Sequence, residues 1–320
     1  MRRRGWRATL KSTNILRMGR PWNRPSVEPH LARSPLRSLA ARRNSSGLLV
    51  LAYHEIADPV RFETQLLRLM ETRRPVSLDE LTQTSGSLSW PSESCALVTF
   101  DDGDPSVLEV GLPILRRLGV PAVAFVVTSL LNSSSPYWWD EVTALMRSGA
   151  RVARLGDDPA FAVRLLKRMP NSERLDLILQ LRDGHPLVVA KQLTSVDVRH
   201  LRDSGIAIGN HTSTHPCLDQ CTDAELRSEI HRAHEQLADM LGEPPLSFAY
   251  PNGNWDARAE QVLRKLGYTT AMLFDHRFAK RGTHPLRLSR VRVASTTEMD
   301  RFELLISGLH PWLHHLRNRE

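Results

Sequence analysis

The sequence predicts an α/β fold built on a parallel sheet or barrel, and three observations lead to this class. Short apolar runs of strand length alternate with stretches in which apolar residues recur at helical spacing. Repeated strand–helix units of this kind are typical of parallel sheets with helical crossovers. Polar clusters follow several of the predicted strands, at the end of the sheet where such barrels place their active sites.

The part of the chain from residue 47 to residue 127 contains three predicted strands and two predicted helices. The apolar runs predict strands at 48–53, 95–100 and 121–127. Apolar residues at helical spacing predict a helix over 60–72. A second helix is predicted over 105–118, because Pro105 lies near its start and Gly119 lies just past its end.

Residues 130–192 interrupt this alternation. They include the pair Trp138 and Trp139 and amphipathic stretches at 161–169 and 174–182. We therefore expect a helical insertion here.

The strand–helix alternation then resumes. Strands are predicted at 206–209, 246–250, 269–273 and 288–293, and helices at 196–203, 222–241, 258–266 and 299–307. Thr222 and Glu225 form a capping box, which marks the start of the longest of these helices.

The composition is that of an ordinary soluble globular protein, with 41% apolar and 24% charged residues in a chain of 320. The three cysteines cannot all pair, which excludes a disulfide framework and favours a reducing compartment. The longest apolar runs are far shorter than the roughly 20 residues of a membrane span. No integral membrane segment is expected.

The net charge of +8 is unevenly distributed, since residues 1–43 contain 12 basic residues and one acid. This stretch also contains Pro and Ser and predicts a flexible leader rather than a folded basic face, so we discount nucleic-acid binding. We expect a disordered extension over 1–46. A transit peptide, or a translation start at Met18 or later, is the alternative. Because no apolar stretch of signal-peptide length precedes residue 48, we expect a cytoplasmic location.

The first candidate site directly follows the strand 95–100. Asp101 and Asp102 are adjacent there and precede Gly103. Adjacent carboxylates repel one another unless a cation or a proton relieves the repulsion. One of the two can ligate a metal while the other takes a proton. An ordinary turn is the alternative, because Asp-Gly is common in turns.

The second candidate site is the histidine pair His211 and His215, four residues apart after the strand 206–209. Pro216 disfavours helical geometry at His215, so a loop or a helix end is expected. Two histidines and one carboxylate, with open positions for water, form the ligand set of a catalytic zinc site, and Asp102 would complete it. With 13 histidines in the chain, a chance match is the alternative.

His54 is the third candidate, because it follows the first predicted strand. A histidine there can act as a general acid near neutral pH if it lies in the same strand-end layer as the other two clusters. The alternative is an ordinary polar residue at a strand end.

Three motifs together resemble those of the polysaccharide deacetylases, carbohydrate esterase family 4, which share the NodB-homology domain. They are T-F-D-D-G at 99–103, H-T-x-x-H at 211–215 and A-Y-P-N-G at 249–253, and the similarity spans about 48–307. The third is a variant, because the family's Arg and Tyr are replaced by Ala249 and Asn252.

This variant resembles the branch that deacetylates exopolysaccharides, including poly-N-acetylglucosamine. In that branch the acid histidine lies in an N-terminal Y-H motif, which Tyr53 and His54 match. The resemblance implies a distorted (β/α) barrel of about seven parallel strands with a helical insertion at about 130–192. It implies a deacetylase domain over 47–310 and a C-terminal tail over 311–320.

The resemblance also implies roles for individual residues. The expected ligands of a divalent metal are Asp102, His211 and His215; zinc is expected, and cobalt and nickel suit the same ligand types. Asp101 would be the catalytic base and His54 the acid. The third motif would contribute Asn252, through its backbone N–H, and Tyr250 to the oxyanion and substrate region.

Two further residues complete the expected site. Trp138 is a candidate for stacking on a sugar ring, although large aromatic residues in a helical insertion are more often part of a core. Arg290, at the end of a later strand, is the candidate replacement for the arginine that is missing at Ala249.

The expected function is therefore metal-dependent hydrolysis of N-acetyl groups on an amino-sugar polysaccharide or oligosaccharide. The alternatives are a catalytically impaired carbohydrate-binding relative and an O-acetyl esterase on the same fold. The D-x-D sequence of residues 102–104 also occurs in phosphoryl-transfer enzymes of the haloacid dehalogenase type. Phosphoryl transfer is therefore a further hypothesis, but it gives the paired histidines no role.

Overall fold

A computed structural model describes residues 27–45, 47–82 and 93–317 and contains a sheet whose paired strands are all parallel. Seven strands follow one another across this sheet in the order β7-β6-β5-β4-β3-β1-β8, and β2 also pairs with β3. The strands are β1 (Leu48–Tyr53), β2 (Arg74–Pro75), β3 (Cys95–Phe100), β4 (Ala122–Val126), β5 (Ile206–Asn210), β6 (Ser247–Ala249), β7 (Thr270–Met272) and β8 (Val291–Arg292). The predicted α/β class is confirmed.

The sheet curls into a distorted barrel, and residues 288–292 connect its two ends. Leu288 pairs in parallel with Met272 of β7, and Val291 pairs with Leu51 of β1. The expected barrel of about seven parallel strands is therefore confirmed. The predicted strand 288–293 is shortened to β8, because its first residues serve as the link to β7.

Both faces of the central strands are buried, which explains their continuous apolar sequences. All six residues of β1 and all six of β3 are buried. Alternate residues belong to two apolar clusters: Val50 and Leu97 belong to one, and Leu51 and Val98 to the other, which also contains residues of the surrounding helices. Side chains of a strand point alternately to its two faces, so a strand buried on both faces must be apolar throughout.

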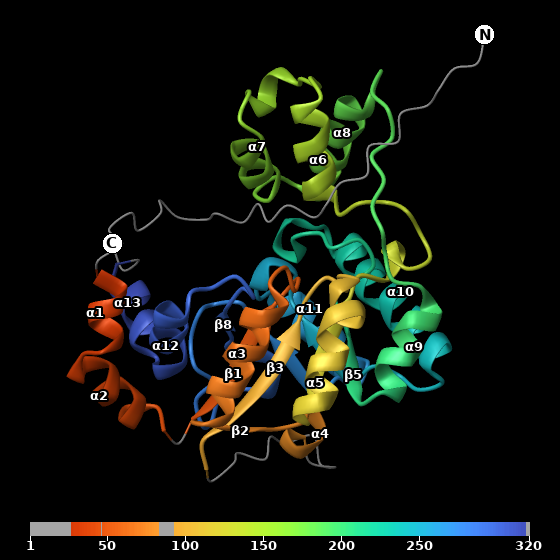
Figure 1. Ribbon diagram of the computed structural model, residues 1–320. Coiled ribbons are helices and arrows are strands. Elements are labelled where there is room, and N and C mark those ends of the chain that lie inside the picture. Colours follow the sequence, from red (N-terminus) through yellow and green to blue (C-terminus); the bar gives the residue numbers. More distant parts are fainter. Residues whose placement is uncertain (1–26, 46, 83–92, 318–320) are drawn as a thin grey trace.

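Helices surround the barrel (Figure 1). They are α3 (Pro59–Met70), α4 (Leu78–Leu81), α5 (Leu112–Leu118), α9 (Ser195–Asp203), α10 (Asp223–Leu241), α11 (Ala257–Lys265) and α12 (Met299–Ser307), with a π-helical turn at Val107–Gly111 and short 3-10 turns at Thr128–Leu130, Ala153–Leu155, Leu218–Gln220, Pro251–Gly253 and Pro285–Arg287. The predicted capping box is present at the start of α10, where Thr222 accepts a hydrogen bond from the backbone of Glu225.

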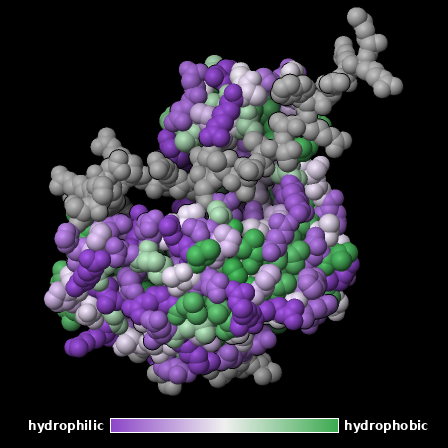
Figure 2. All heavy atoms as spheres, in the orientation of Figure 1, coloured by the Kyte–Doolittle hydropathy of each residue, from purple (hydrophilic) through white to green (hydrophobic). Residues whose placement is uncertain are grey.

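The expected helical insertion contains α6 (Trp138–Arg147), α7 (Pro159–Leu166) and α8 (Asn171–Arg182). These three helices form a lobe with an apolar cluster of its own, and the lobe stands beyond one end of the barrel (Figure 1). Hydrophilic residues cover most of the face shown in Figure 2, on the barrel and on the lobe alike. Asn171 links the two parts through a 2.9 Å hydrogen bond to Glu225.

The expectation of disorder over 1–46 needs correction where the structure describes this stretch. Residues 27–43 form α1 (Val27–Ala32) and α2 (Pro35–Arg43), which pack against α12, and Arg37 makes a 2.9 Å ion pair with Glu303 of that helix. Most of the expected tail is also helical, in α13 (Leu309–Arg317). These helices are stabilised by tertiary contacts with α12, which composition does not reveal. Residues 1–26 and 318–320 lie outside the described part of the chain.

In the described residues, no helix combines the length and the apolar composition that a bilayer crossing requires.

Candidate metal centre and active site

The candidate site lies where β1, β3, β5 and β6 end. Asp101 and Asp102 directly follow β3, and the turn there needs positive backbone φ angles, 72° at Asp102 and 81° at Gly103. A Cβ atom at residue 103 would lie 3.2 Å from Val126. Gly103 therefore allows a sharp turn close to β4, which brings the Asp102 side chain toward the loop after β5.

Asp102, His211 and His215 converge in the structure. The Asp102 Oδ1 atom lies 3.3 Å from His211 Nε2 and 3.4 Å from His215 Nε2. One ligand atom from each residue lies within 4.8 Å of the other two, a spacing that a single metal ion can bridge.

The surroundings of these residues also suit a metal. His211 Nδ1 lies 2.8 Å from the Ala249 carbonyl oxygen, and donation of this N–H leaves the lone pair of Nε2 facing Asp102. Asp102 Oδ1 is buried and has no hydrogen-bond partner in the part of the chain that the structure describes. Burial, followed by the charge of His211, lowers the pKa of His215 to about 3, so its ring is neutral and its nitrogen lone pair is available.

The histidine loop is held in place by its own polar groups and by α10. Asn210 accepts a 2.7 Å hydrogen bond from the backbone of Thr212, and the Thr212 hydroxyl accepts a 3.0 Å bond from the backbone of His215. Glu229 of α10 accepts a 2.7 Å bond from the backbone of Thr214. Thr212 and His215 have positive φ angles, so the segment is a loop, as Pro216 predicts.

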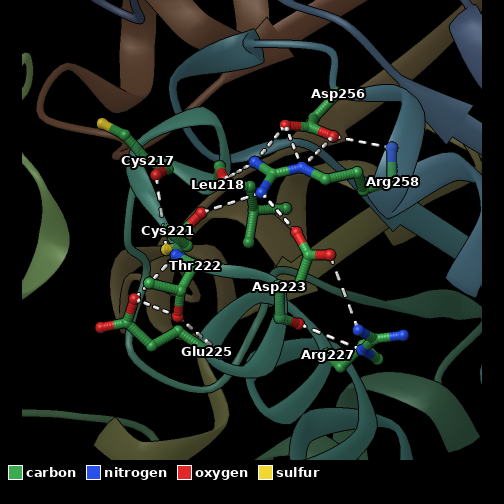
Figure 3. Close-up of polar contacts among 9 residues, drawn as sticks. All are labelled: Cys217, Leu218, Cys221, Thr222, Asp223, Glu225, Arg227, Asp256 and Arg258. Carbon is green, nitrogen blue, oxygen red and sulfur yellow. Dashed lines mark hydrogen bonds and ion pairs between the residues drawn. The ribbon is translucent and has the colours of Figure 1, made fainter.

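The segment that follows the loop is fixed by Arg258, as Figure 3 shows. The Arg258 guanidinium donates to the carbonyl oxygen of Cys221 at 3.1 Å and to Asp223 at 2.8 Å, and it is itself paired with Asp256 at 2.7 Å. This network joins the start of α10 to the start of α11. The loop with His211 and His215 is therefore anchored at its C-terminal end.

Asp101 forms a buried ion pair with Arg290. Each carboxylate oxygen accepts a 2.7 Å hydrogen bond from a different guanidinium nitrogen, and the Arg290 side chain has no exposed surface. Arg290 also donates to the carbonyl oxygen of Leu273 at 2.7 Å. Burial raises the pKa of Asp101, but Arg290, His211 and His54 together lower it further, so the net pKa lies below the usual value. Asp101 is therefore ionised and held in one orientation.

His54 lines the same cavity as Asp101 and Asp102. Its ring centroid lies 5.4 Å from that of Phe274, in an edge-to-face arrangement. Burial lowers the pKa of His54, while the nearby charges of Asp102 and Asp101 act in the opposite direction. The structure thus brings His54 to the site, and its role as an acid remains a prediction.

The third motif contributes Asn252 to the cavity, whereas the Tyr250 side chain is fully buried in an apolar cluster. The Tyr250 hydroxyl donates to the carbonyl oxygen of Leu286 at 3.1 Å, so it is not available to a ligand. The φ angle is 62° at Asn252 and 78° at Gly253, and a Cβ atom at residue 253 would lie 2.2 Å from Phe274. Only glycine fits there, and the turn directs Asn252 into the cavity.

Trp138 does not line the cavity, contrary to its expected role in sugar contact. It is 9% exposed and belongs to the core of the lobe, and its indole N–H donates to the carbonyl oxygen of His215 at 3.1 Å. Its neighbour Trp139 lines the cavity instead. The Trp139 ring stacks on Tyr137 at 5.0 Å and meets the His215 ring at 4.7 Å.

Lys167 and Arg292 also line the cavity, and no sequence motif indicated either of them. Lys167, just past α7, donates a 2.7 Å hydrogen bond to Asn252. Burial lowers the pKa of both side chains, and the negative charge of Asp102 raises the pKa of each in partial opposition. The cavity has a volume of about 1370 Å³, large enough for several sugar rings, and it includes residues of the barrel, of the lobe and of α12 and α13.

Comparison with known proteins agrees with this fold and with these motifs. The profile of the polysaccharide deacetylase family matches residues 90–157 and 186–271. YxkH of Bacillus subtilis (strain 168), described by its name as a polysaccharide deacetylase, is 21% identical over 204 residues, which are 64% of this chain. The matched region spans about half, 53%, of the length of that relative.

Two solved structures share the fold. The deacetylase PplD of Streptococcus pyogenes, solved in complex with acetate, has a TM-score of 0.55 at 18% identity, and the match covers 82% of this chain and 98% of PplD. IcaB from Ammonifex degensii has a TM-score of 0.56 at 20% identity, with coverage of 82% and 96%.

The matched segments include the aspartate pair, both histidines of the candidate metal cluster and the third motif, whereas His54, Lys167 and Arg292 of the cavity lie outside them. Together with the distorted barrel, this match shows that the chain belongs to the polysaccharide deacetylase family (carbohydrate esterase family 4, NodB homology).

Proposed function

We propose that the protein is a metal-dependent hydrolase that removes N-acetyl groups from an amino-sugar polysaccharide or oligosaccharide. One observation carries the proposal: the convergent ligand atoms of Asp102, His211 and His215 share a cavity with an ionised Asp101. Such a cavity contains both a place for a metal ion and a base beside it.

The metal ligands would be Asp102, His211 and His215, and zinc suits two imidazoles and one carboxylate. Cobalt and nickel suit the same ligand types. Bound there, the ion would polarise the acetyl carbonyl group and lower the pKa of a water molecule.

Asp101 would accept the proton of the attacking water. Its pKa lies below the usual value, so it is unprotonated at neutral pH, and Arg290 fixes both of its oxygens. Arg290 would therefore act as a positioning residue that holds the base in its charged form. This assigns to Arg290 the place of the arginine that the third motif lacks at Ala249.

His54 would donate a proton to the amine as the carbon–nitrogen bond breaks. Burial lowers its pKa, so the imidazolium releases its proton readily. The negative charges of Asp101 and Asp102 act against this effect and favour uptake of a proton before the reaction. The products would be a free amino sugar and acetate.

Substrate binding is assigned to further groups that line the same cavity as the candidate metal ligands. Trp139 presents an aromatic ring that a sugar can stack on, and Lys167 offers a hydrogen-bond donor. The backbone N–H of Asn252 is the proposed donor to the developing oxyanion.

The impaired carbohydrate-binding alternative loses its main support, because Arg290 makes the two hydrogen bonds to Asp101 that a motif arginine would be expected to supply. The phosphoryl-transfer alternative is also weakened, since Asp104 is engaged locally by hydrogen bonds from Ser106. O-acetyl ester hydrolysis needs the same residues and is separated from amide hydrolysis by substrate choice.

The test is acetate release from N-acetylglucosamine oligomers by the metal-loaded protein, next to Asp101→Asn. We expect the variant to lose about 10²- to 10⁴-fold in rate while it retains its metal. Asp183→Asn, on the exposed surface after α8, is the matched control and should behave as the wild type.

Absence of acetate release by a protein that contains one metal ion per chain would contradict the proposed substrate class. An O-acetylated glycan should then be assayed. Equal release by the wild type and Asp101→Asn would contradict the assignment of the base.

A further inference from the structure

A second cavity, of about 990 Å³, lies between α2, residues 277–281 and α13, and we call it the α2–α13 groove. Helix α13 contributes residues to this groove and to the catalytic cavity, but no residue lines both. The residues that line it are Leu36, Leu39, Ala40, Arg43, Asn44, Gly47, Arg277, Phe278, Ala279, Lys280, Arg281, Gly308, Leu309, Pro311, Trp312 and His315.

The groove has a strongly positive lining. Its charged residues are Arg43, Arg277, Lys280 and Arg281, and none of its lining residues is an acid. Arg277 donates its hydrogen bonds to the His315 ring. Among the residues that the structure describes, none of the four cations has an acidic partner within ion-pair distance. The groove therefore attracts anions.

Exposed apolar side chains flank these cations. Leu36 is 56%, Leu39 is 65% and Trp312 is 58% exposed. Exposed leucine and tryptophan next to arginine and lysine are typical of segments that lie in the interface of a membrane, where the apolar groups enter the acyl boundary and the cations meet lipid phosphates.

The charges also disfavour two other occupants of the groove, the N-terminal segment of the same chain and a second copy of the chain. Residues 1–26 contain eight basic residues and no acid, so the groove repels this segment of its own chain. A second copy of the chain would bring the same cations face to face with those of the first. A nucleic acid would satisfy the cations but would leave Leu36 and Leu39 without an apolar partner.

We propose that the α2–α13 groove binds the surface of an anionic lipid bilayer. Leu36, Leu39 and Trp312 enter the headgroup region, and the four cations contact lipid phosphates. Because α13 also contributes to the wall of the catalytic cavity, the groove holds that cavity close to the membrane surface. This binding is independent of the proposed hydrolase activity.

The test is co-sedimentation of the full chain with vesicles of phosphatidylglycerol and phosphatidylcholine, and with vesicles of phosphatidylcholine alone. We expect binding only to the anionic vesicles. The double variant Lys280→Glu with Arg281→Glu should lose about tenfold or more of this binding, since each basic residue near the surface contributes separately. Trp312→Ser should weaken the binding that persists in high salt, because salt screens the charges and leaves the apolar contribution.

Matched controls use exposed residues that do not line the groove. Arg232→Glu with Lys265→Glu reverses two positive charges on α10 and α11, as the groove variant does, and Leu187→Ser removes an apolar side chain that is 86% exposed. Both controls should bind as the wild type does. Metal content and the unfolding transition of each variant verify that it is folded.

Three results would overturn the proposal: no binding to anionic vesicles, wild-type binding by the groove variants, or equal loss in the control pair. The second result would assign membrane binding to residues outside the groove. Sedimentation velocity tests whether a second copy of the chain occupies the groove. If the wild type is a dimer that does not bind vesicles, and the groove variants are monomers, the groove is an interface between two copies.

Discussion

The barrel edge and the helical lobe both contribute to the candidate active-site cavity, but they do so in different ways. The barrel edge provides Asp101, Asp102 and His211, which directly follow strands β3 and β5. The lobe provides Trp139 and Lys167, which lie on or next to the helices α6 and α7.

This difference explains why one set has a motif and the other has none. Asp102 and His215 of the barrel edge have positive φ angles, 72° and 57°, and each must place a particular ligand atom at a particular point. A ring or a cation that contacts a sugar needs only to lie within reach, and many helix positions satisfy that condition. Changes at the barrel edge should therefore affect metal binding and rate, and changes in the lobe should affect substrate affinity.

The largest effect is expected for Asp102→Ala, which removes one of the three proposed metal ligands. Metal content should fall from one ion per chain to near zero, and acetate release should fall by roughly a thousandfold or more. Metal analysis after dialysis and a rate assay measure both effects. A variant that retains its metal would show that Asp102 is not a ligand.

The next largest effect is expected for Arg290→Gln, because it leaves Asp101 as a buried charge without a partner. The free energy of unfolding should fall by about 3–5 kcal/mol. Urea unfolding measures this loss. The pKa of Asp101 should also rise, since Arg290 is the first of the groups that lower it, ahead of His211 and His54.

Two comparisons sharpen this prediction. The double variant Arg290→Gln with Asp101→Asn should recover part of the lost stability, because no buried charge remains. Arg287→Gln, which removes a half-exposed partner of Glu260, should cost about 1 kcal/mol or less. Similar losses for Arg287→Gln and Arg290→Gln would count against the buried ion pair.

A smaller effect is expected in the lobe, for Trp139→Ala and Lys167→Met. Each should raise KM by about tenfold, with little change in kcat and none in metal content, because neither residue belongs to the candidate metal cluster. Steady-state kinetics with N-acetylglucosamine oligomers separates the two constants. Lys191→Met, at an exposed lysine that pairs with Glu109, is the control. If Trp139→Ala or Lys167→Met lowered kcat as much as Asp101→Asn does, lobe residues would not differ from barrel-edge residues in their effect on the rate.

The smallest effect concerns pH and His276, which lies near α13. Burial, reinforced by the charges of His310, His314, His315 and Arg301, lowers the pKa of His276 to about 3. The unfolded chain, with a pKa near 6.5, binds this proton first as the pH falls, so stability is lost from about pH 6.5 downward. Between pH 7.5 and pH 5 the contribution is about 1–2 kcal/mol.

His276→Gln removes the titrating ring and should flatten this part of the stability profile. Urea unfolding at several pH values tests it. An unchanged slope would mean that His276 is not the group responsible.

Much of the barrel was predictable because its strands are buried on both faces. The runs 48–53 and 95–100 match β1 and β3, and the Thr222 capping box marks α10. The helices α1, α2 and α13 were not predicted, since each is short and is stabilised by packing against α12 or its neighbours.

The sequence by itself determined the barrel class and the family, and it indicated the three residues that converge as the candidate metal cluster. It could do so because a metal ligand set needs defined residue types next to defined strand ends. Tertiary structure alone decided that Trp139 rather than Trp138 faces the cavity, and that Lys167 and Arg292 line it. Which of two adjacent tryptophans faces a ligand depends on how a helix is rotated against its neighbours. Contacts between segments distant in the sequence set that rotation.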